Sequence, residues 1–474
     1  MTRFDLISVG GGTAGLVTAA GGAALGLSVA LVEREALGGD CLWSGCVPSK
    51  ALVAAGKLAY RMRHAEALGL RGASPAHALE SVMERVDDAR RRIARHDDPQ
   101  RFRDLGVEVV FGRAEVRAPG VVEVEGRRLE TARLVIATGA SAAIPPIPGL
   151  TEAGGLTHRT ALERRRLPAH LVVIGGGPVG VELAQVYRRL GAGVTVLEML
   201  PQLLPREEPE AAETLRQVLE AEGVAVRTGT RVERVEPSTD GRHRVLGRGP
   251  AGEPVEATGD AILVATGRRP NGAGLGLEAL GVAVVGGAVV VDRRLRAGVP
   301  GVWAAGDVVG GPQFTHVAEY HAKLVLRNAV FPFPGAADYT AVPAVTYSDP
   351  EVARVGLAET EARHRHGVVE VYRYPFADLD RAIVDGADEG FVKVITRRRG
   401  RIVGATVVGS GAGELVVPFV LAIEHGIALP KLARIVYPYP TMSEGIKRAA
   451  NEYYRARLAG RSGAWLRKVV RWLA

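Results

Sequence analysis

Two stretches of the chain repeat the same order of apolar and small residues. Residues 4–9 (FDLISV) are predicted to form a buried strand, followed by glycines in G-x-G-x-x-G spacing, a helix of small residues and a second apolar strand, SVALVE. The same order returns over residues 170–198. A strand, glycine turn, helix and strand ending in an acid are typical of dinucleotide-binding folds. The pattern therefore predicts two bound dinucleotides.

The two units match position by position. In each, the terminal glutamate lies 23 positions after the first glycine, and the units are offset by 165 residues. Glycine allows a tight turn and a close approach to the pyrophosphate, while the glutamate accepts hydrogen bonds from ribose hydroxyls. The predicted cofactor-binding residues are Gly10, Gly12, Gly15 and Glu33 in the first unit and Gly175, Gly177, Gly180 and Glu198 in the second.

A similar strand and turn closes each unit, RLVIATGA at 133–140 and AILVATGRRPN at 261–271. We expect Thr138, Gly139 and Gly267 in these turns to contact the cofactors. A further strand end, VPGVWAAGDVVG, carries Asp307. An acid at the mouth of a sheet is placed to bind a sugar-like hydroxyl chain, and the alternative is an ordinary turn aspartate.

From about residue 341 the pattern changes to alternating apolar strands and a helical stretch, which predicts a separate α+β domain. Hydrophobic residues make up 47% and charged residues 24% of the 474, which favours a folded, multidomain protein. The net charge of +8 is spread along the chain, and no nucleic-acid motif accompanies it. Neither a signal peptide nor a membrane span is recognised, so we expect a cytoplasmic protein.

The only two cysteines, Cys41 and Cys46, lie in GGDCLWSGCVPSK. Two cysteines in a cytosolic chain are more often redox-active than structural. We expect them in a tight loop that leads into the helix VPSKALVAAGKLAY, whose N-terminus would stabilise a thiolate. The alternatives are a structural disulfide and a metal pair; two sulfurs alone make an incomplete zinc site, and we expect no resident metal.

These motifs, with AAGD and the PTMSE segment, resemble the class I pyridine nucleotide-disulfide oxidoreductases over nearly the whole chain. The resemblance implies an α/β fold with two nested Rossmann-like domains that bind FAD and NAD(P)H, and a C-terminal α+β dimerisation domain that forms a homodimer. The implied divisions are residues 1–148 (FAD, first part), 149–271 (NAD(P)), 272–340 (FAD, central part) and 341–474 (dimerisation).

By the same resemblance, Cys46 faces the flavin and Cys41 is the exposed thiol that attacks the acceptor. Lys50 would lie near the flavin with Glu182 as its acidic partner; the alternative is a surface ion pair of little energetic value. Glu198 favours NADH, because a carboxylate repels a 2′-phosphate. Arg206 nearby leaves NADPH open.

The chain departs from the thiol-handling members in YPYPTMSE, where Tyr439 replaces a general acid–base histidine while Glu444 remains. Tyrosine, with a pKa near 10, is a poor proton shuttle at neutral pH. The segment resembles that of mercuric reductases, which also carry a C-terminal cysteine pair; residues 455–474 contain no cysteine.

Two features have competing interpretations. His316 and His321 could supply a replacement base, although the family places this segment against the flavin and a packing role is favoured. The last residues, SGAWLRKVVRWLA, have the spacing of a basic amphipathic helix. Such a helix could contact an anionic membrane surface, and packing on the dimer is the favoured alternative.

The leading hypothesis is an enzyme that passes electrons from NADH through FAD and the Cys41–Cys46 disulfide to a small-molecule or metal-ion acceptor, as a mercuric reductase does. The second is a dihydrolipoyl dehydrogenase-like or general disulfide reductase. The others are a quinone or dye reductase and a non-catalytic flavin redox sensor.

Overall fold

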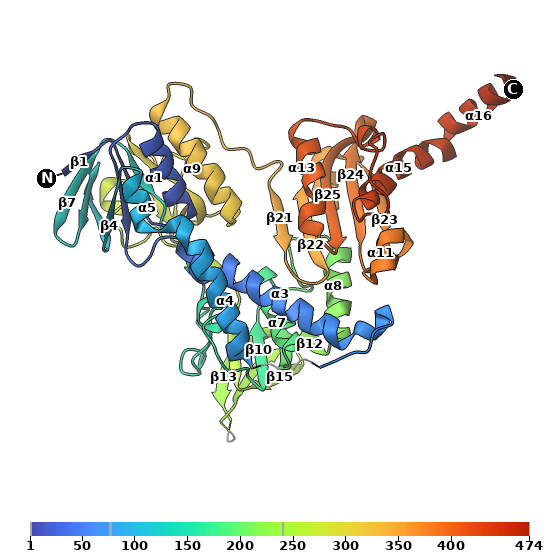
Figure 1. Cartoon of the computed structure of the whole chain (residues 1–474), viewed down its shortest axis with the longest axis horizontal. Coiled ribbons are helices and arrows are strands. Elements are labelled where there is room, and N and C mark those ends of the chain that lie inside the picture. The colour runs from blue at the N-terminus through green and yellow to red at the C-terminus, as the bar shows by residue number, and fades with distance from the viewer. Residues whose placement is uncertain (1, 75–77, 239–240, 474) are drawn as a thin grey trace. The chain divides into compact units, whose positions relative to one another are not determined.

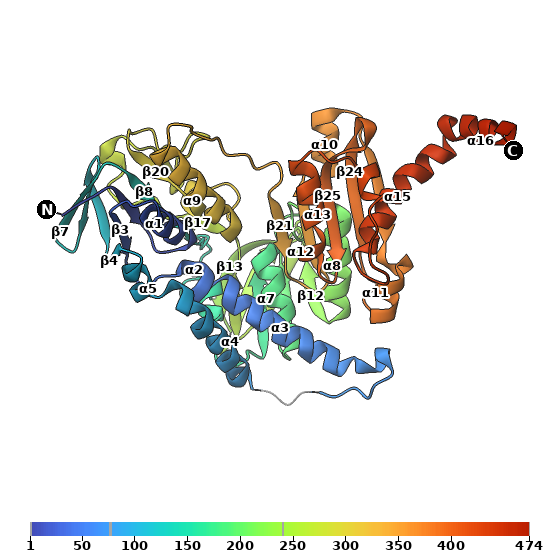
Figure 2. The same ribbon diagram turned by 45° about the horizontal axis from the view of Figure 1, so that its top comes forward.

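The computed structural model describes residues 2–74, 78–238 and 241–473. The chain divides into two units, each built from three segments. The first unit contains Met1–Ala54, His77–Leu167 and Ile262–Asp338, and the second contains Ala55–Ala76, Pro168–Ala261 and Tyr339–Ala474. Figures 1 and 2 show their elements. The expected division of the chain at residues 148, 271 and 340 stays a prediction.

A five-stranded parallel sheet forms the centre of the first unit, in the order β20-β8-β2-β3-β4. Its strands are β2 (Leu6–Val9), β3 (Val29–Glu33), β4 (Val107–Phe111), β8 (Leu134–Ile136) and β20 (Val302–Ala304). All of β2 is buried, as expected for a parallel strand covered on both faces. Helices α1 (Thr13–Ala24) and α9 (Thr315–Val330) lie side by side against one face (Figure 1).

A smaller sheet covers the other face, in the order β1-β7-β6-β5, and shares a hydrophobic core with it. Its strands are β1 (Thr2–Phe4), β5 (Ala114–Ala118), β6 (Val121–Val124) and β7 (Arg127–Thr131). Two short antiparallel pairs complete the strands: β9 (Ala140–Ala142) with β17 (Arg268–Pro270), which are far apart in sequence, and the hairpin of β18 (Val284–Val285) with β19 (Ala288–Val289). The other helices are α2 (Gly39–Trp43), α4 (Leu79–Ala94), α5 (Pro99–Asp104), α6 (His158–Ala161) and the 3-10 turns η2 (Arg95–Asp97), η3 (Glu278–Leu280) and η4 (Gly306–Val309).

Helix α3 (Cys46–Arg63) begins in the first unit, ends in the second and is followed by η1 (Ala65–Leu68). The second dinucleotide unit contains the parallel strands β10 (His170–Ile174), β11 (Gly193–Leu197) and β12 (Val224–Arg227), with helices α7 (Pro178–Arg189) and α8 (Pro209–Ala221). An antiparallel meander follows, β13 (Arg231–Pro237), β14 (His243–Arg248) and β15 (Pro254–Gly259). Strand β16 (Ala261–Val264) leads the chain back to the first unit.

The C-terminal part of the second unit is an antiparallel sheet in the order β21-β22-β25-β24-β23. Its strands are β21 (Pro343–Thr346), β22 (Glu351–Gly356), β23 (Glu370–Pro375), β24 (Phe391–Arg397) and β25 (Arg401–Gly409). The helices are α10 (Glu359–His366), α11 (Asp380–Asp385), α12 (Ala412–Leu415), α13 (Val417–Glu424), α14 (Leu429–Leu432), α15 (Glu444–Ala459) and α16 (Arg461–Leu473), with 3-10 turns η5 (Phe376–Asp378) and η6 (Arg398–Gly400). This confirms the predicted α+β pattern. Within the described ranges, no helix has the length and apolar character needed to cross a membrane.

Candidate active site

The glycines of the first dinucleotide unit are required by the backbone. Gly10 has a φ of 113°, and a Cβ there would lie 2.2 Å from the carbonyl oxygen of Ala137. A Cβ on Gly15 would lie 1.7 Å from the carbonyl oxygen of Gly10. A side chain on Gly10 would push the turn after β2 away from the backbone that follows β8, and one on Gly15 would push α1 away from the turn after β2.

The N-terminus of α1 fits a dinucleotide phosphate. Its N-cap is Gly12, so no side chain caps the first-turn amides, and a Cβ there would meet only Gly39 Cα at 3.8 Å. Glu33 at the end of β3 accepts hydrogen bonds from Gly11 N at 2.6 Å and Glu35 N at 2.8 Å. Uncapped amides beside an oriented carboxylate are the donor and acceptor set that a dinucleotide requires.

The second dinucleotide-binding repeat has the same features. Gly175 has a φ of 110°, and Gly177 is the N-cap of α7 with open space around its missing side chain. Gly180 is buried in the first turns of α7. Glu198 accepts from Gly176 N at 2.5 Å and from Leu200 N at 2.7 Å, so its carboxylate is held at the end of the strand. These residues fit a second dinucleotide.

The two turns that close the dinucleotide-binding repeats both lie in the first unit of the chain and are hydrogen-bonded to each other. Thr138 Oγ1 donates to the carbonyl oxygen of Asn271 at 2.8 Å, and Asn271 Nδ2 donates to that of Thr138 at 3.1 Å. Gly139 and Gly267 have φ values of 70° and 130°, and nothing lies within 4 Å of a Cβ built on either. Their contact with a cofactor stays a prediction.

The two cysteines lie in helices rather than in the expected loop. Cys41 is in the short helix α2, and Cys46 is the first residue of α3. Both are free thiols, and Cys46 Sγ lies 3.3 Å from Thr315 Oγ1 at the start of α9. Gly38 and Gly39, with φ values of 106° and 58°, turn the chain into α2. The expectation that both cysteines lie in a tight loop ahead of the helix is therefore wrong, because Cys41 is inside α2 and Cys46 begins α3.

The two thiols differ in acidity. The hydrogen bond from Cys41, with help from Thr315 and the charge of Lys50, lowers the pKa of Cys46 to about 6. The same interaction, seen from its donor, raises the pKa of Cys41. Cys46 is the more exposed of the two, whereas the resemblance implied an exposed Cys41. The thiolate is thus favoured on Cys46, the sulfur that the resemblance places at the flavin. The greater exposure of Cys46 does not match the implied roles, and the assignment of those roles stays a prediction.

Asp40, which was not predicted from the sequence, is the shared partner of a cluster of polar and charged side chains beside the cysteines. It accepts hydrogen bonds from Ser44 Oγ at 2.6 Å and Arg268 Nη1 at 2.8 Å, and it contacts His158 Nε2 at 3.0 Å. These partners hold the pKa of Asp40 far below its usual range despite burial. Arg268 Nη2 also lies 3.5 Å from Asp307 Oδ2. No sequence motif joins residues so far apart in the chain.

Asp307 lies in η4, directly after β20, as predicted for an acid at the end of a strand. Burial raises its pKa, and the Arg268 guanidinium opposes that rise. His321 is buried beneath this turn and its ring accepts from Gly306 N at 3.2 Å. Burial lowers the pKa of His321 to about 4, so the ring packs as a neutral group. His316 instead stacks on Phe314, with ring centroids 5.1 Å apart.

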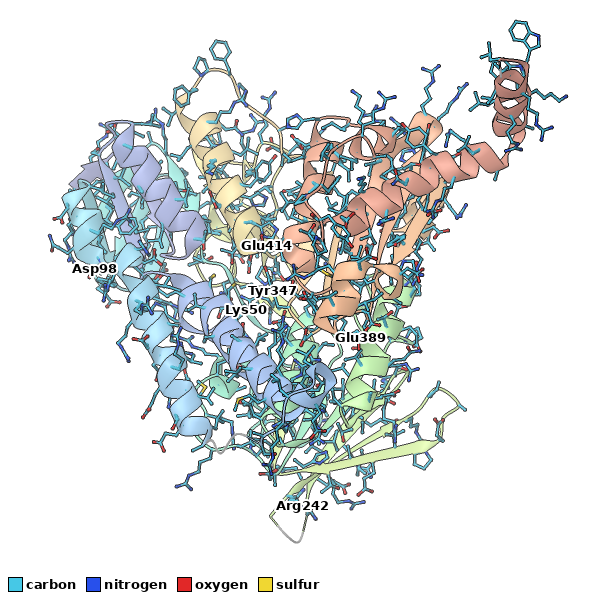
Figure 3. All side chains as sticks on the ribbon, turned by 45° about the vertical axis from the view of Figure 1, so that its right-hand side comes forward. Lys50, Asp98, Arg242, Tyr347, Glu389 and Glu414 are labelled. Carbon is cyan, nitrogen blue, oxygen red and sulfur yellow. The ribbon has the colours of Figure 1, made fainter. Side chains whose placement is uncertain are left out.

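Lys50 and Glu182 belong to different units, so their pairing stays a prediction. Lys50 lies on the first turns of α3 (Figure 3). Glu182 is buried in α7, and its Oε1 accepts a hydrogen bond from Tyr347 N at 2.8 Å. That bond fixes α7 to the segment after β21 within the second unit.

Glu444 is the first residue of α15, and Tyr439 lies in the non-helical segment before it. Tyr439 is 68% exposed, and its hydrogen bond to Asp380 raises the pKa of the phenol. Glu444 is buried, with Arg448 at 3.9 Å, and its Oε2 has no hydrogen-bond partner among the described residues. A phenol that stays protonated at neutral pH cannot serve as a base.

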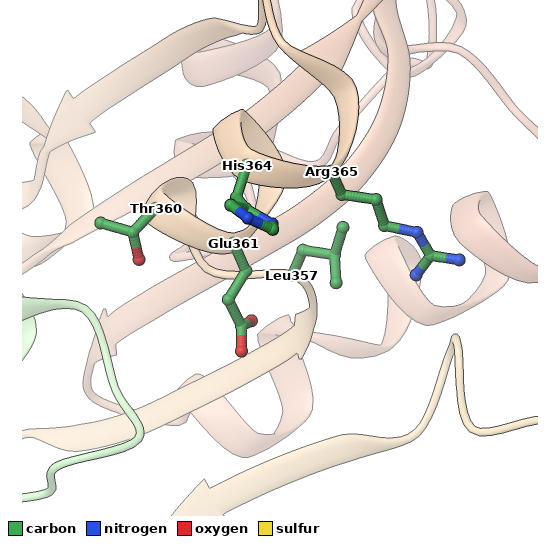
Figure 4. A pocket seen from close by; sticks show the side chains of 5 residues that line it. All are labelled: Leu357, Thr360, Glu361, His364 and Arg365. Carbon is green, nitrogen blue, oxygen red and sulfur yellow. The ribbon is translucent and has the colours of Figure 1, made fainter.

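Two further observations concern ligands. A pocket of about 670 Å³ on α10 is lined by Leu357, Thr360, Glu361, His364 and Arg365 (Figure 4) and contains none of the predicted site residues. In the part of the chain that the structure describes, no group of three or more His, Cys, Asp and Glu side chains is arranged to hold a metal ion.

Comparison with known proteins gives two family matches. Residues 4–322 match the pyridine nucleotide-disulphide oxidoreductase family, and residues 342–450 match its dimerisation domain. A dihydrolipoyl dehydrogenase of Thermus scotoductus is 37% identical over 96% of this chain and 98% of the relative. A mercuric reductase of Streptomyces lividans is 36% identical over 95% of this chain and 96% of the relative.

Solved structures agree with this fold. The Cu(II) complex of the HOCl-induced flavoprotein disulfide reductase RclA from Escherichia coli matches with a TM-score of 0.85 and 28% identity, covering 95% of this chain and 100% of that one. LpdA from Mycobacterium tuberculosis matches with a TM-score of 0.85 and 29% identity, covering 96% and 100%.

These matches confirm the expected fold class of two nucleotide-binding domains and a dimerisation domain. Family members use FAD and NAD(P)H with a redox-active disulfide, and the dimerisation domain supports a homodimer. The relatives divide between mercuric reductases and dihydrolipoyl dehydrogenases, so the family alone leaves the acceptor open. The chain belongs to the class I pyridine nucleotide-disulfide oxidoreductases and is an FAD- and NAD(P)H-dependent enzyme.

Proposed function

We propose that this enzyme uses NADH to reduce a thiol-bound soft metal ion such as Hg(II), with Cys41 and Cys46 as its redox-active pair. The observation that carries the proposal is Tyr439 in the place of a general base, with its phenol pKa raised by Asp380. A disulfide substrate needs proton transfer to and from its thiols. A metal ion that moves between thiolates needs none.

The thiols are proposed to divide the work. Cys46, with its pKa near 6, is a thiolate at neutral pH and faces the flavin. Cys41 displaces a carrier thiol and takes the metal ion, and Cys46 becomes the second sulfur ligand. Soft thiolates bind soft metal ions strongly.

FAD, when bound, supplies the chemistry of accepting a hydride from NAD(P)H and passing the electron pair onward. Gly10, Gly12, Gly15, Glu33 and Asp307 are proposed to hold FAD, and Gly175, Gly177, Gly180 and Glu198 to hold NADH. In the overall balance, one NADH supplies two electrons, Hg(II) becomes Hg(0), and one proton and two carrier thiolates are released.

Lys50 and Glu182 are proposed to form the charge pair at the flavin, and Glu198 to favour NADH. The carboxylate of Glu198 is held by two backbone amides at the strand end, where a 2′-phosphate would meet its negative charge. The initial rates with NADH and NADPH test this preference directly, and equal efficiency with both would contradict it.

The second candidate function is reduction of a disulfide. It is favoured by the dihydrolipoyl dehydrogenase relative at 37% identity and by the disulfide reductase named among the solved structures. Such an enzyme would need a general acid–base other than Tyr439, because a phenol with a raised pKa does not take up a proton at neutral pH. The buried Glu444, whose Oε2 has no partner among the described residues, is the nearest acid in sequence.

An acceptor screen with the purified flavin-loaded enzyme separates these functions. NADH oxidation is measured with Hg(II) in excess small thiol, lipoamide, glutathione disulfide and a quinone. We expect Hg(II) to be preferred, and Cys41→Ser and Cys46→Ser each to lower that rate at least about 100-fold. Tyr439→His should raise the rate with lipoamide.

Two outcomes would overturn the proposal that the acceptor is a thiol-bound metal ion. A higher rate with lipoamide or glutathione disulfide than with Hg(II) would establish the disulfide reductase. A quinone rate that survives in both cysteine variants would place the chemistry at the flavin alone. In either case the flavin content of each variant is the control for intact folding.

A further inference from the structure

Helix α16 (Arg461–Leu473) lies outside the region that the family accounts for. The dimerisation-domain match ends at residue 450, within α15. Figures 1 and 2 both show α16 continuing from the end of α15 and extending beyond the β21–β25 sheet of the same unit. Its role is therefore not explained by the core of the dimerisation domain.

The helix separates its side chains by chemistry. Six apolar side chains fall on one arc and three basic side chains on the other. The apolar arc contains Trp465, Leu466, Val469, Val470, Trp472 and Leu473 and the basic arc contains Arg467, Lys468 and Arg471. Trp465 is 66% exposed and Trp472 is 84% exposed. Indole rings at this exposure form an apolar surface that the rest of the unit leaves uncovered.

One contact sets the orientation of the helix on α15. Arg467 Nη1 donates a hydrogen bond to the carbonyl oxygen of Leu458 at 2.6 Å, in the last turn of α15. A Cβ on Gly463 would lie 1.9 Å from that same oxygen, so glycine is required at this bend. The basic arc thus contacts α15 through Arg467, while both tryptophans point to solvent.

The charge of this region is entirely positive. After Glu452 the sequence contains six basic residues and no acidic residue. Each basic side chain near an anionic bilayer contributes about 1 kcal/mol to attraction. Two copies of α16 packed by their apolar arcs across a two-fold axis would leave the basic side chains without an anionic partner. The helix also reaches only about 20 Å, which is short of the roughly 30 Å hydrocarbon core of a bilayer.

We propose that α16 docks the enzyme on an anionic phospholipid surface. The helix lies parallel to the membrane plane, with Trp465 and Trp472 at the level of the headgroups and the basic side chains on lipid phosphates. This surface is independent of the electron acceptor.

The test is sedimentation of the flavin-loaded enzyme with vesicles. We expect at least ten times more bound protein with phosphatidylglycerol-containing vesicles than with pure phosphatidylcholine vesicles, and less binding as salt is raised. Trp465→Ser with Trp472→Ser, and separately Arg467→Glu with Lys468→Glu and Arg471→Glu, should abolish it. Solution NADH oxidation should be unchanged in both variants.

A matched control reverses three exposed arginines on another helix, Arg85→Glu, Arg91→Glu and Arg92→Glu on α4. It changes the net charge equally and should still bind. Equal binding of the wild type to both vesicle types would overturn the proposal. So would dissociation of the dimer by the tryptophan substitutions, because α16 would then be packed on the partner subunit.

Discussion

At the scale of single residues, the acidity of Cys46 follows from three neighbours that the chain brings together. Cys41 and Lys50 are close in sequence, whereas Thr315 comes from α9. A thiolate is the reactive form of cysteine, so the lowered pKa of Cys46 prepares this sulfur for chemistry at neutral pH.

The pH dependence of Cys46 alkylation in the reduced enzyme is the first prediction. Because its pKa is lowered to about 6, the thiolate is present above that pH and is lost as the pH falls through it. Mass spectrometry after brief iodoacetamide treatment should give a midpoint near pH 6 for Cys46 and a far higher one for Cys41. Lys50→Met should raise the Cys46 midpoint. A common midpoint for both thiols would contradict the asymmetry.

Asp40→Asn is the second prediction. The amide keeps the shape of the side chain but cannot accept from Ser44, His158 and Arg268 together. We expect a loss of about 1–3 kcal/mol in the free energy of unfolding, measured by urea denaturation. The negative charge of Asp40 opposes ionisation of Cys46, so the pH midpoint of Cys46 alkylation should also fall in this variant.

Ser44→Ala is the control for this variant. It removes one hydrogen bond and leaves the Asp40 charge in place. It should lower the free energy of unfolding less than Asp40→Asn does. The pH midpoint of Cys46 alkylation should stay above that of the Asp40→Asn variant. Equal effects of the two substitutions would show that the charge of Asp40 is unimportant.

At the scale of elements, a buried ion network joins parts of the second unit. Arg189, at the end of α7, donates two hydrogen bonds to Glu222, at 2.6 and 2.8 Å, and one to Asp349 at 2.7 Å. Its guanidinium also lies 4.2 Å from the ring centre of Tyr60 on α3. The arginine side chain is 3% exposed, so its charge depends on these partners.

The third prediction is that Arg189→Met destabilises the enzyme by about 3–5 kcal/mol, because the buried Glu222 loses its charged partner and keeps only the neutral amide of Gln185. Chemical denaturation of the flavin-loaded protein measures the loss. The double variant Arg189→Met with Glu222→Gln should recover part of the stability, since the buried charge is then removed. A double variant no more stable than the single one would contradict this account.

At the scale of the whole molecule, the dimerisation domain presents apolar side chains to solvent in a single chain. Val436 is 92% exposed, and Ile435, Val417 and Leu421 are also exposed on α13 and the segment after α14. Apolar surface of this kind marks an interface.

The fourth prediction concerns the dimer. Sedimentation should give twice the 50.0 kDa mass of the chain. Leu421→Glu with Val436→Glu should shift the enzyme to a monomer, because each substitution would place a charge in an apolar contact. Ile383→Glu, at an exposed apolar position on α11, is the comparison for a surface charge elsewhere. A dimer that survives the double substitution would exclude this patch.

Much of the fold is local enough to be read from the sequence. The repeated glycines predicted both dinucleotide units because a positive φ and a close backbone approach demand glycine whatever surrounds them. Apolar strands such as β2, β3 and β24 were found from runs of buried residues. The meanders β5–β7 and β13–β15 were not predicted, because short strands of mixed polarity carry a weak pattern.

The sequence by itself determined the family, the cofactors and the two thiols, since each rests on residues close together in the chain. Only the tertiary structure decided that Cys41 lies within α2, that Cys46 begins α3, and that Asp40 contacts His158 and Arg268. The reason is physical: the charge and acidity of a side chain depend on its neighbours in space, and those neighbours come from strands and helices that folding alone brings together.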